Sequence, residues 1–193
     1  TPTLIDYQTI SPQATNPTWA QGLFFYDQVN DSLTFYDSIS GNDLHLGREI
    51  QLRCYNQTGA TIAAGSAVYI NGQHSQFPTV ALAQANASPA CNAWGITNTA
   101  IANNSYGDVV VLGKFTGLDT HSFNSGDLLY LSATTAGGLT NVEPTSPNYV
   151  VPIGYCIYSN PSQGVVSITV PLPPQGFASL YGTATLSQGG TNA

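Results

Sequence analysis

Residues 65–70 read GSAVYI, and residues 126–131 read GDLLYL. Both stretches begin with a glycine, and both place a tyrosine four residues later, at Tyr69 and Tyr130. Self-similarity at a long spacing indicates one supersecondary unit that is built twice, usually with the two copies packed against each other. The repeat therefore predicts architecture more directly than chemistry.

The residues around these two stretches recur in the same order. Thr58-Gly59 precedes the first stretch, and Thr116-Gly117 precedes the second. Downstream, AWGI at 93–96 corresponds to PIGY at 152–155, and GDVVVLG at 107–113 corresponds to GVVSITV at 164–170. Short apolar runs between Gly, Asn, Ser and Pro turns are typical of β-strands. We expect a mainly β protein with two small barrel- or sandwich-like units, at residues 58–117 and 116–171.

The residues before the repeat predict an arm, a β-hairpin and a strand. Residues 1–20 are rich in Pro, Thr and Gln, and they indicate an extended docking arm, because proline favours extended geometry in the residue before it. Residues 21–57 contain two aromatic runs, 23–27 and 33–37, joined by an Asn/Asp/Ser turn that is typical of a hairpin. The alternation over 48–56 predicts a half-buried strand with Ile50, Leu52 and Cys54 on one face.

The remaining segments predict no helix and a C-terminal linker. Residues 80–87 are rich in alanine, but Pro78 and Pro89 leave room for about two helical turns, so we expect an extended segment. Prolines end the last strand after Val170, because proline cannot donate to a sheet ladder. The Gly/Pro/Thr-rich residues 172–193 indicate an extended linker that leads to a further part or that orders on a partner.

Charge is scarce in this chain and strongly unbalanced. Charged residues make up 7% of the sequence, against roughly a quarter in ordinary soluble domains. Three basic residues (Arg48, Arg53 and Lys114) stand against ten acidic ones, for a net charge of −7. Nucleic acid is not an expected partner, because phosphate binding needs clustered Lys and Arg. A membrane is not an expected partner either, because no long apolar run occurs. A neutral surface rich in hydrogen-bonding groups suits a protein that is largely covered by further copies of the same chain or by partner proteins.

The cysteines and histidines predict no catalytic or metal site. Cys54, Cys91 and Cys156 are odd in number and widely spaced, which favours buried small hydrophobes over a zinc site or a disulfide framework, although one disulfide stays possible. The three histidines lie far apart without acids at ligand spacing, and we expect them at the surface; they are His45, His74 and His121. An acid, a base and hydroxyls adjoin at 119–122, but triad members normally come from separate elements, so we expect a turn.

Two further groups have a structural and a functional interpretation. Four aspartates punctuate the hairpin region, at positions 27, 31, 37 and 43, without the ligand spacing of a calcium loop; we favour turn hydrogen bonds over an ion. Eleven tyrosines and seven phenylalanines suit contact with carbohydrate or protein, or a packed core. For Tyr69 and Tyr130 we expect the core, since both lie in apolar runs.

Several motifs together resemble a module of tailed-bacteriophage fibres and other virion structural proteins. The likeness covers roughly residues 22–170, and its motifs occur in this order: GLFFYD at 22–27, LGRE at 46–49, NQTGATI at 56–62, WGI at 94–96, GKFTGL at 113–118, GDLLYLS at 126–132 and IGY at 153–155. Residues 182–193 are similar to hinge segments that lead into distal parts of phage fibres. The repeat half also resembles the small β domain of capsid decoration proteins.

This resemblance implies a virion location and self-association, often as a homotrimer. It implies contacts with other virion proteins of the tail, portal or neck, or capsid, and it implies no enzymatic activity, cofactor, metal or catalytic residue. Our first hypothesis is the particle-proximal part of a tail or head fibre, and the alternative is a capsid decoration protein. A polysaccharide-binding or -cleaving tailspike fragment is a third hypothesis, but cleavage needs paired carboxylates that the sequence does not show.

Overall fold

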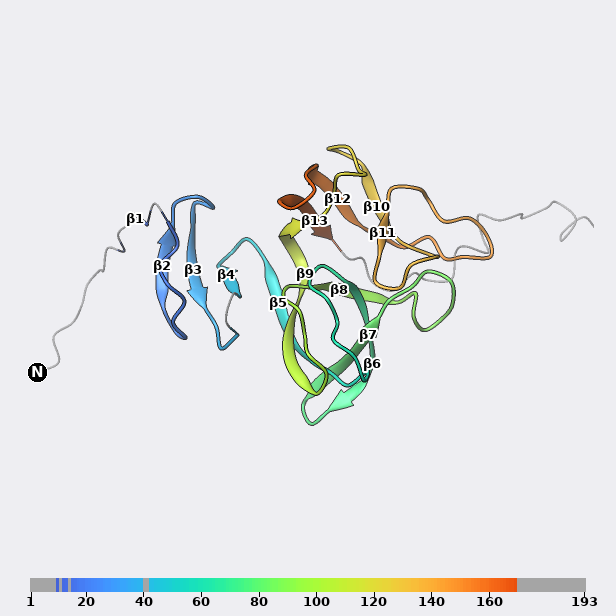
Figure 1. Cartoon of the computed structure of the whole chain (residues 1–193), viewed down its shortest axis with the longest axis horizontal. Helices are drawn as coiled ribbons and strands as arrows, with labels where there is room; N and C mark the ends of the chain where they lie inside the picture. Colours follow the sequence, from blue (N-terminus) through green and yellow to red (C-terminus); the bar gives the residue numbers. More distant parts are fainter. Residues whose placement is uncertain (1–9, 11, 14, 40–41, 170–193) are drawn as a thin grey trace, which may run out of the picture. The chain divides into compact units, whose positions relative to one another are not determined.

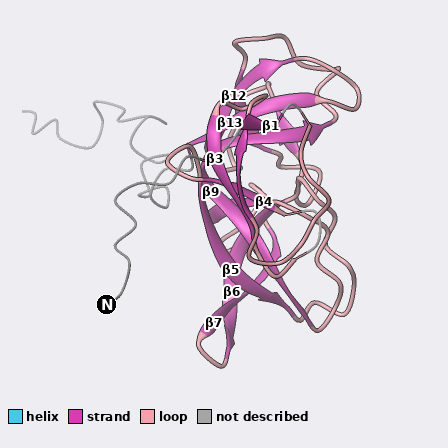
Figure 2. Cartoon of the chain, turned by 90° about the vertical axis from the view of Figure 1, so that its left-hand side faces the viewer, coloured by secondary structure: helices cyan, strands magenta, loops and turns pink. Residues whose placement is uncertain are grey.

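The computed structural model describes residues 10, 12–13, 15–39 and 42–169. Every regular element in these residues is a β-strand, and none is a helix, so the prediction of a mainly β protein is confirmed (Figures 1 and 2). Most of the predicted arm, including residues 1–9, and the predicted linker 172–193 lie outside the described residues. The chain divides into two compact units, residues 1–51 and 52–193, which we call the N-terminal unit and the C-terminal unit.

The N-terminal unit is a small sheet around the predicted hairpin. Its strands are β1 (Pro12–Gln13), β2 (Phe24–Asp27), β3 (Ser32–Tyr36) and β4 (Asp43–His45), and they pair in that order. β2 and β3 are antiparallel, with Phe24 opposite Phe35, as the two aromatic runs predict. Phe25 and Tyr36 are buried with ring centres 4.9 Å apart, and the Tyr36 hydroxyl donates to the carbonyl of Pro17 at 2.8 Å. One aromatic pair therefore supplies much of this small core.

The C-terminal unit is one nine-stranded sheet, whose first strand begins two residues before the unit boundary. Its strands are β5 (Ile50–Asn56), β6 (Ala67–His74), β7 (Phe77–Leu82), β8 (Ala93–Thr97), β9 (Ser105–Leu118), β10 (Leu128–Leu131), β11 (Leu139–Thr140), β12 (Pro152–Tyr158) and β13 (Gly164–Thr169). The strand order is β11-β10-β12-β13-β9-β5-β7-β6-β8, and β8 also pairs with β9. This extra pairing closes β9, β5, β7, β6 and β8 into a barrel. The far half of β9 continues into β13, β12, β10 and β11, which form an open sheet.

The sequence repeat has a counterpart in strand pairing. β6 pairs with β8 in the first repeat unit as β10 pairs with β12 in the second, and each ladder has a register shift at the same place. The matching pairs are Val68–Gly95 and Tyr69–Ala93 in the first unit, and Leu129–Gly154 and Tyr130–Pro152 in the second. Gly65 and Gly126, which begin the repeated stretches, both have positive φ, a conformation that glycine adopts at little steric cost.

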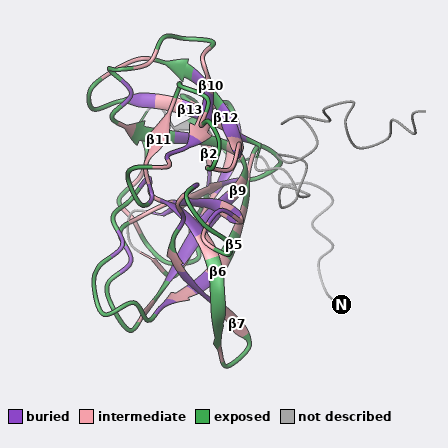
Figure 3. Ribbon diagram, turned by 90° about the vertical axis from the view of Figure 1, so that its right-hand side faces the viewer, coloured by how far each residue is buried: buried purple, intermediate pink, exposed green. Residues whose placement is uncertain are grey.

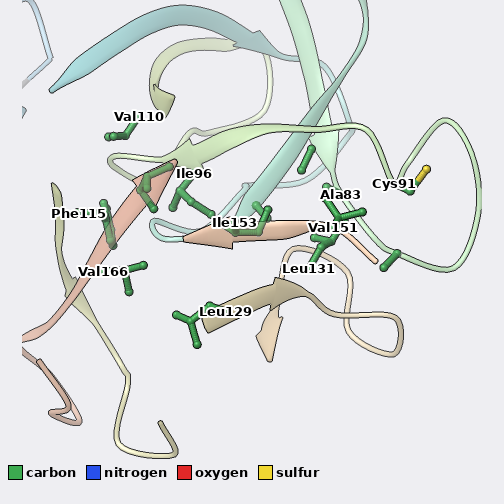
Figure 4. Close-up of a cluster of buried hydrophobic side chains, with 14 of the residues drawn as sticks. Ala83, Cys91, Ile96, Val110, Phe115, Leu129, Leu131, Val151, Ile153 and Val166 are labelled. Carbon is green, nitrogen blue, oxygen red and sulfur yellow. The ribbon is translucent and has the colours of Figure 1, made fainter. Parts of the chain in front are cut away.

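Two hydrophobic clusters hold the C-terminal unit together. Figure 3 shows in purple where buried residues lie along the strands. The smaller one fills the barrel and contains Cys54, Ile62, Val68, Val80, Ile101 and Val109. The larger one joins the two repeat units, and Figure 4 shows Ile96 of β8 and Ile153 of β12 within it. Backbone hydrogen bonds reinforce this contact: Ala67 donates to Gly137 at 2.9 Å, and Gly137 donates to Ala83 at 2.7 Å. We call this larger cluster the shared core.

Two strand predictions are adjusted by the structure. β5 begins at Ile50 rather than at Arg48, and only Cys54 of the predicted apolar face is buried, while Ile50 and Leu52 stay about half exposed. The paired residues on neighbouring β7 lie opposite Tyr55 and Asn56, so the start of β5 projects beyond that ladder. The alanine-rich segment 80–87 contains no helix, as expected, but it is extended only at its start, since β7 ends at Leu82 and residues 85–87 form a turn.

Candidate functional site

His45 lies in the N-terminal unit among three carboxylates, contrary to the prediction of a surface histidine. Its ring is nearly buried, with Nδ1 3.2 Å from Glu49 Oε1 and Nε2 3.4 Å from Asp27 Oδ2. Asp43 Oδ2 lies 3.8 Å from Nε2. Burial opposes the charged form of His45, but the hydrogen bond and charge of Glu49, together with Asp43 and Asp27, outweigh burial and raise the pKa of His45 above 6.5.

Two of the three carboxylates around His45, those of Asp27 and Glu49, accept several local hydrogen bonds. Asp27 accepts from the backbone amides of Val29 at 2.8 Å and Asn30 at 3.1 Å, and from the Asn30 side chain at 2.7 Å. Burial favours the neutral form of Asp27, yet these bonds prevail and lower its pKa below 3.8. Glu49 and Asp27 flank opposite ring nitrogens, so they do not converge on one point. The described residues contain no group of three or more side chains suited to a metal ion.

This cluster predicts a pH-dependent stability for the N-terminal unit. Because the pKa of His45 is raised above its unfolded value of 6.5, its contribution is complete below pH 6.5 and is lost as pH rises through the folded pKa. The contribution of Asp27, whose pKa is lowered, is present above pH 3.8 and lost at more acid pH. Asp43 acts in the opposite sense to Asp27, because burial raises its pKa and its contribution is lost as pH rises above 3.8; we expect the effects of Asp27 and His45 to outweigh it. We expect the largest stability between about pH 4 and 6.5.

The measurement uses Trp19, the tryptophan of the N-terminal unit, in a Trp94→Phe background of the full chain. His45→Gln should lower the free energy of unfolding by roughly 2 kcal/mol at pH 5.5, the range of charge-assisted hydrogen bonds. The difference in the free energy of unfolding between His45→Gln and its parent protein should become smaller at pH 8.5. A difference that is constant with pH would contradict a charged His45.

The other hairpin aspartates serve separate turns, in agreement with the preferred interpretation. Asp37 accepts from the backbone amide of Ile39 at 2.6 Å and from the side chain of Asn42 at 2.9 Å. Asp31 accepts from the Tyr26 hydroxyl and lies 3.9 Å from Arg48. These contacts face different turns, so the aspartates form no common calcium cage.

Residues 119–122, which include an acid, a base and two hydroxyl groups, lie partly at the surface and partly in the interior. Asp119 and His121 are exposed, and Asp119 Oδ1 lies 2.6 Å from His121 Nδ1. This hydrogen bond, with the amide of His121, lowers the pKa of Asp119. Thr120 is buried, and its hydroxyl donates to the carbonyl of Tyr158 at 2.9 Å. The stretch is therefore a loop anchored by Thr120 and not an assembled triad.

His74 belongs to an aromatic cluster on the C-terminal unit that sequence reasoning missed. Its ring stacks on Tyr55 with centres 3.8 Å apart and 9° between the planes. Tyr106 meets Tyr55 and Phe77 edge-on at 5.0 and 5.2 Å, and the Arg53 guanidinium lies 5.6 Å from the Tyr106 ring centre. Edge-on and stacked rings stabilise each other beyond their buried area. These rings tie the β6–β7 hairpin to β5 and β9.

The three cysteines are free and buried, as the preferred interpretation expected. Burial, with the nearby charge of Asp108, raises the pKa of Cys54 to about 12. Burial also raises the pKa of Cys91 and of Cys156. A thiol with a raised pKa is rarely a thiolate at neutral pH and is a poor nucleophile or ligand.

The two repeat tyrosines differ in their surroundings, and the prediction of a core position holds for only one. Tyr69 packs against the shared core. Tyr130 is half-buried between the inward side chains Leu129 and Leu131, and its hydroxyl donates to Glu143 Oε2 at 3.3 Å. The reason is that the second repeat unit packs on the Tyr69 side of the first, whereas Tyr130 lies on the side of the second unit that faces away from the shared core.

The uncovered side of the second repeat unit is the candidate interaction surface. Tyr155 is 50% exposed between the buried residues Gly154 and Cys156. Ile157 and Tyr158 follow at 51% and 50% exposure. Strand alternation alone does not reveal this face, because a register shift beside Ile153 leaves Ile153 in the shared core while Tyr155, two residues later, is exposed.

Comparisons with known proteins add no relative. No protein-family model, curated sequence or solved structure matches this chain. Within the described part of the chain there is also no helix long and apolar enough to cross a membrane.

Proposed function

We propose that this chain is a structural component of a bacteriophage virion, and that it forms the particle-proximal part of a tail or head fibre. In this role it attaches to the particle, positions more distal parts and performs no catalysis. The sequence resemblance over residues 22–170 motivates the proposal. Self-association, as a homotrimer in the resembling family, is part of it.

The observation that carries the proposal is the way in which the two repeat units are joined. The fourteen-residue strand β9 belongs to both units, and one shared core fills the space between them. A continuous strand and a common core resist relative movement, because a packed interior transmits strain rather than yielding to it. This construction suits a mechanical connector.

The few charges of the chain agree with this role. Only 7% of the residues of the chain are charged, and several Tyr, Ile and Leu side chains are about half exposed; protein interfaces are likewise poor in charge and rich in aromatic residues. Two of the three acidic residues that cluster around His45, Asp27 and Glu49, accept local hydrogen bonds. They offer no support for the tailspike hydrolase hypothesis.

Localisation on the particle tests the proposal. Antibodies raised against the full chain would be applied to purified phage particles that carry it, and electron microscopy would show where they bind. We expect label where a fibre joins the tail or head. Label spread over the whole shell would favour the capsid decoration alternative, and particles without label would refute both virion roles. Antibodies preabsorbed with the purified chain are the control.

A further inference from the structure

A single asparagine of the sequence is followed directly by glycine, and both residues lie exposed on a strand. They are Asn71 and Gly72, in the outer part of β6, where residues 70–73 are all exposed (Figure 3). The ladder between β6 and β7 shifts its register between Ile70 and Gly72. Asn71 is therefore the additional residue of a β-bulge and has no counterpart on β7.

The surroundings of this bulge leave the two residues open to water. β8 pairs with residues 67–69 of β6, and none of the described strands pairs with β6 on that side at Asn71. Apart from its chain neighbours, a Cβ added to Gly72 would meet a single atom within 4 Å, the Thr79 hydroxyl oxygen at 3.0 Å. Toward the hairpin tip, Pro78 of β7 has no N–H to donate to β6. This end of the hairpin is therefore suited to local opening.

Other asparagines of the chain are held differently. Asn160 precedes a proline, whose nitrogen carries no hydrogen. Three others donate their side-chain amides to protein oxygens at distances between 2.7 and 3.1 Å, namely Asn56, Asn141 and Asn148. The side chain of Asn71 has no hydrogen bond to any residue in the described part of the chain.

From these observations we propose that Asn71 is a site of spontaneous deamidation, with Gly72 supplying the attacking nitrogen. Hydroxide removes the amide proton of Gly72, and the nitrogen forms a bond with Cγ of Asn71. The bond between Cγ and Nδ2 breaks, and ammonia leaves with a proton from water, which regenerates the hydroxide. Glycine favours this ring closure because it has no Cβ to obstruct the approach. The reaction is independent of the proposed function.

Hydrolysis of the resulting succinimide ring gives two products. Water adds to one of the two ring carbonyls, and the bond between that carbonyl carbon and the Gly72 nitrogen breaks. Breakage at Cγ gives aspartate, and breakage at the main-chain carbonyl carbon gives isoaspartate. Either product adds one negative charge to a chain with a net charge of −7. Isoaspartate also adds one carbon to the main chain of β6, at a bulge that already contains an additional residue.

Peptide mapping of the full chain by mass spectrometry is the first test. After incubation at mildly alkaline pH, trypsin releases residues 54–114, which follow Arg53 and end at Lys114. We expect the mass gain from exchange of NH₂ for OH at position 71, as isoaspartate and aspartate. Gly72→Ala should slow this gain about tenfold or more, the equivalent of about 1.4 kcal/mol in activation free energy. Asn71→Ser should abolish the gain at this position.

The second test detects the ring itself. Hydroxylamine attacks a succinimide and cleaves the chain at that point. The folded protein should therefore yield fragments 1–71 and 72–193, because the sequence contains a single Asn-Gly pair. Gly72→Ala should give much less of both fragments. This readout depends on ring closure and not on the later hydrolysis.

The reference is the same chain unfolded in guanidinium chloride. Because local opening costs much less than global unfolding, the folded chain should deamidate at position 71 within about a hundredfold of the unfolded rate. A slower reaction would show that the fold protects Asn71, and it would refute the proposal. A gain in the folded chain that Gly72→Ala leaves unchanged would also refute it, since ring closure through Gly72 would not be the route. Antibody labelling of the phage particle tests the proposed function separately.

Discussion

Gly154→Ala is expected to destabilise the C-terminal unit by about 3 kcal/mol or more, the upper range for an added core atom. A Cβ at this position would lie 1.7 Å from the carbonyl oxygen of Ser167 and 2.8 Å from its carbonyl carbon. Both atoms belong to the backbone of β13, so a side-chain rotation cannot relieve the clash. The β12–β13 ladder must separate or shift. Urea unfolding followed by Trp94 fluorescence, in a Trp19→Phe background, measures the loss.

The chain offers a matched control and a repeat-related variant. Gly72→Ala places a Cβ 3.0 Å from only one atom, the Thr79 hydroxyl oxygen, and should cost no more than about 1 kcal/mol. Gly95→Ala should be severe like Gly154→Ala, because its Cβ would lie 2.5 Å from the carbonyl oxygen of Val110. A Gly154→Ala protein with wild-type stability would mean that β12 and β13 are further apart than described.

Ile96→Ala is the second substitution with a large expected effect. Ile96 is completely buried in the shared core, on the face of the first repeat unit that the second unit covers. Removing a buried isoleucine side chain to alanine costs about 2–5 kcal/mol, since burial is lost and a cavity remains. Ile70→Ala removes the same atoms from a side chain that is 46% exposed, and it should cost less than half as much.

The number of unfolding transitions tests the shared core as directly as the size of the stability loss does. Ile96 belongs to a cluster that contains residues of both repeat units. Ile96→Ala should therefore lower the unfolding midpoint of the whole C-terminal unit, which should still unfold in a single transition. Calorimetry and Trp94 fluorescence should give the same midpoint. Two separate transitions, with only one moved by the substitution, would show that the repeat units fold independently.

Local patterns predicted the elements of this fold, whereas its packing depends on distant partners. The aromatic runs at 23–27 and 33–37 predicted β2 and β3, because a short polar turn between alternating strands is a local signal. The position of His45 was predicted wrongly although Asp43 and Glu49 lie only two and four residues away, because its burial also depends on Asp27, on a strand that is distant in the sequence. Likewise, Tyr69 and Tyr130 have equivalent sequence contexts, and only the way one repeat unit covers the other distinguishes them.

Strand β9 sets a limit on how this chain can vary. Its adjacent residues Val109 and Val110 point to opposite faces and belong to different clusters, Val109 to the barrel interior and Val110 to the shared core. Side chains alternate strictly along a strand, so inserting or deleting one residue would exchange the two assignments from that point onward. Loops of the chain can change length, but the number of residues in β9 must be kept, because it decides which side chains face which cluster. Substitutions in the two repeat units are therefore tolerated more readily than an insertion or deletion within the strand that they share.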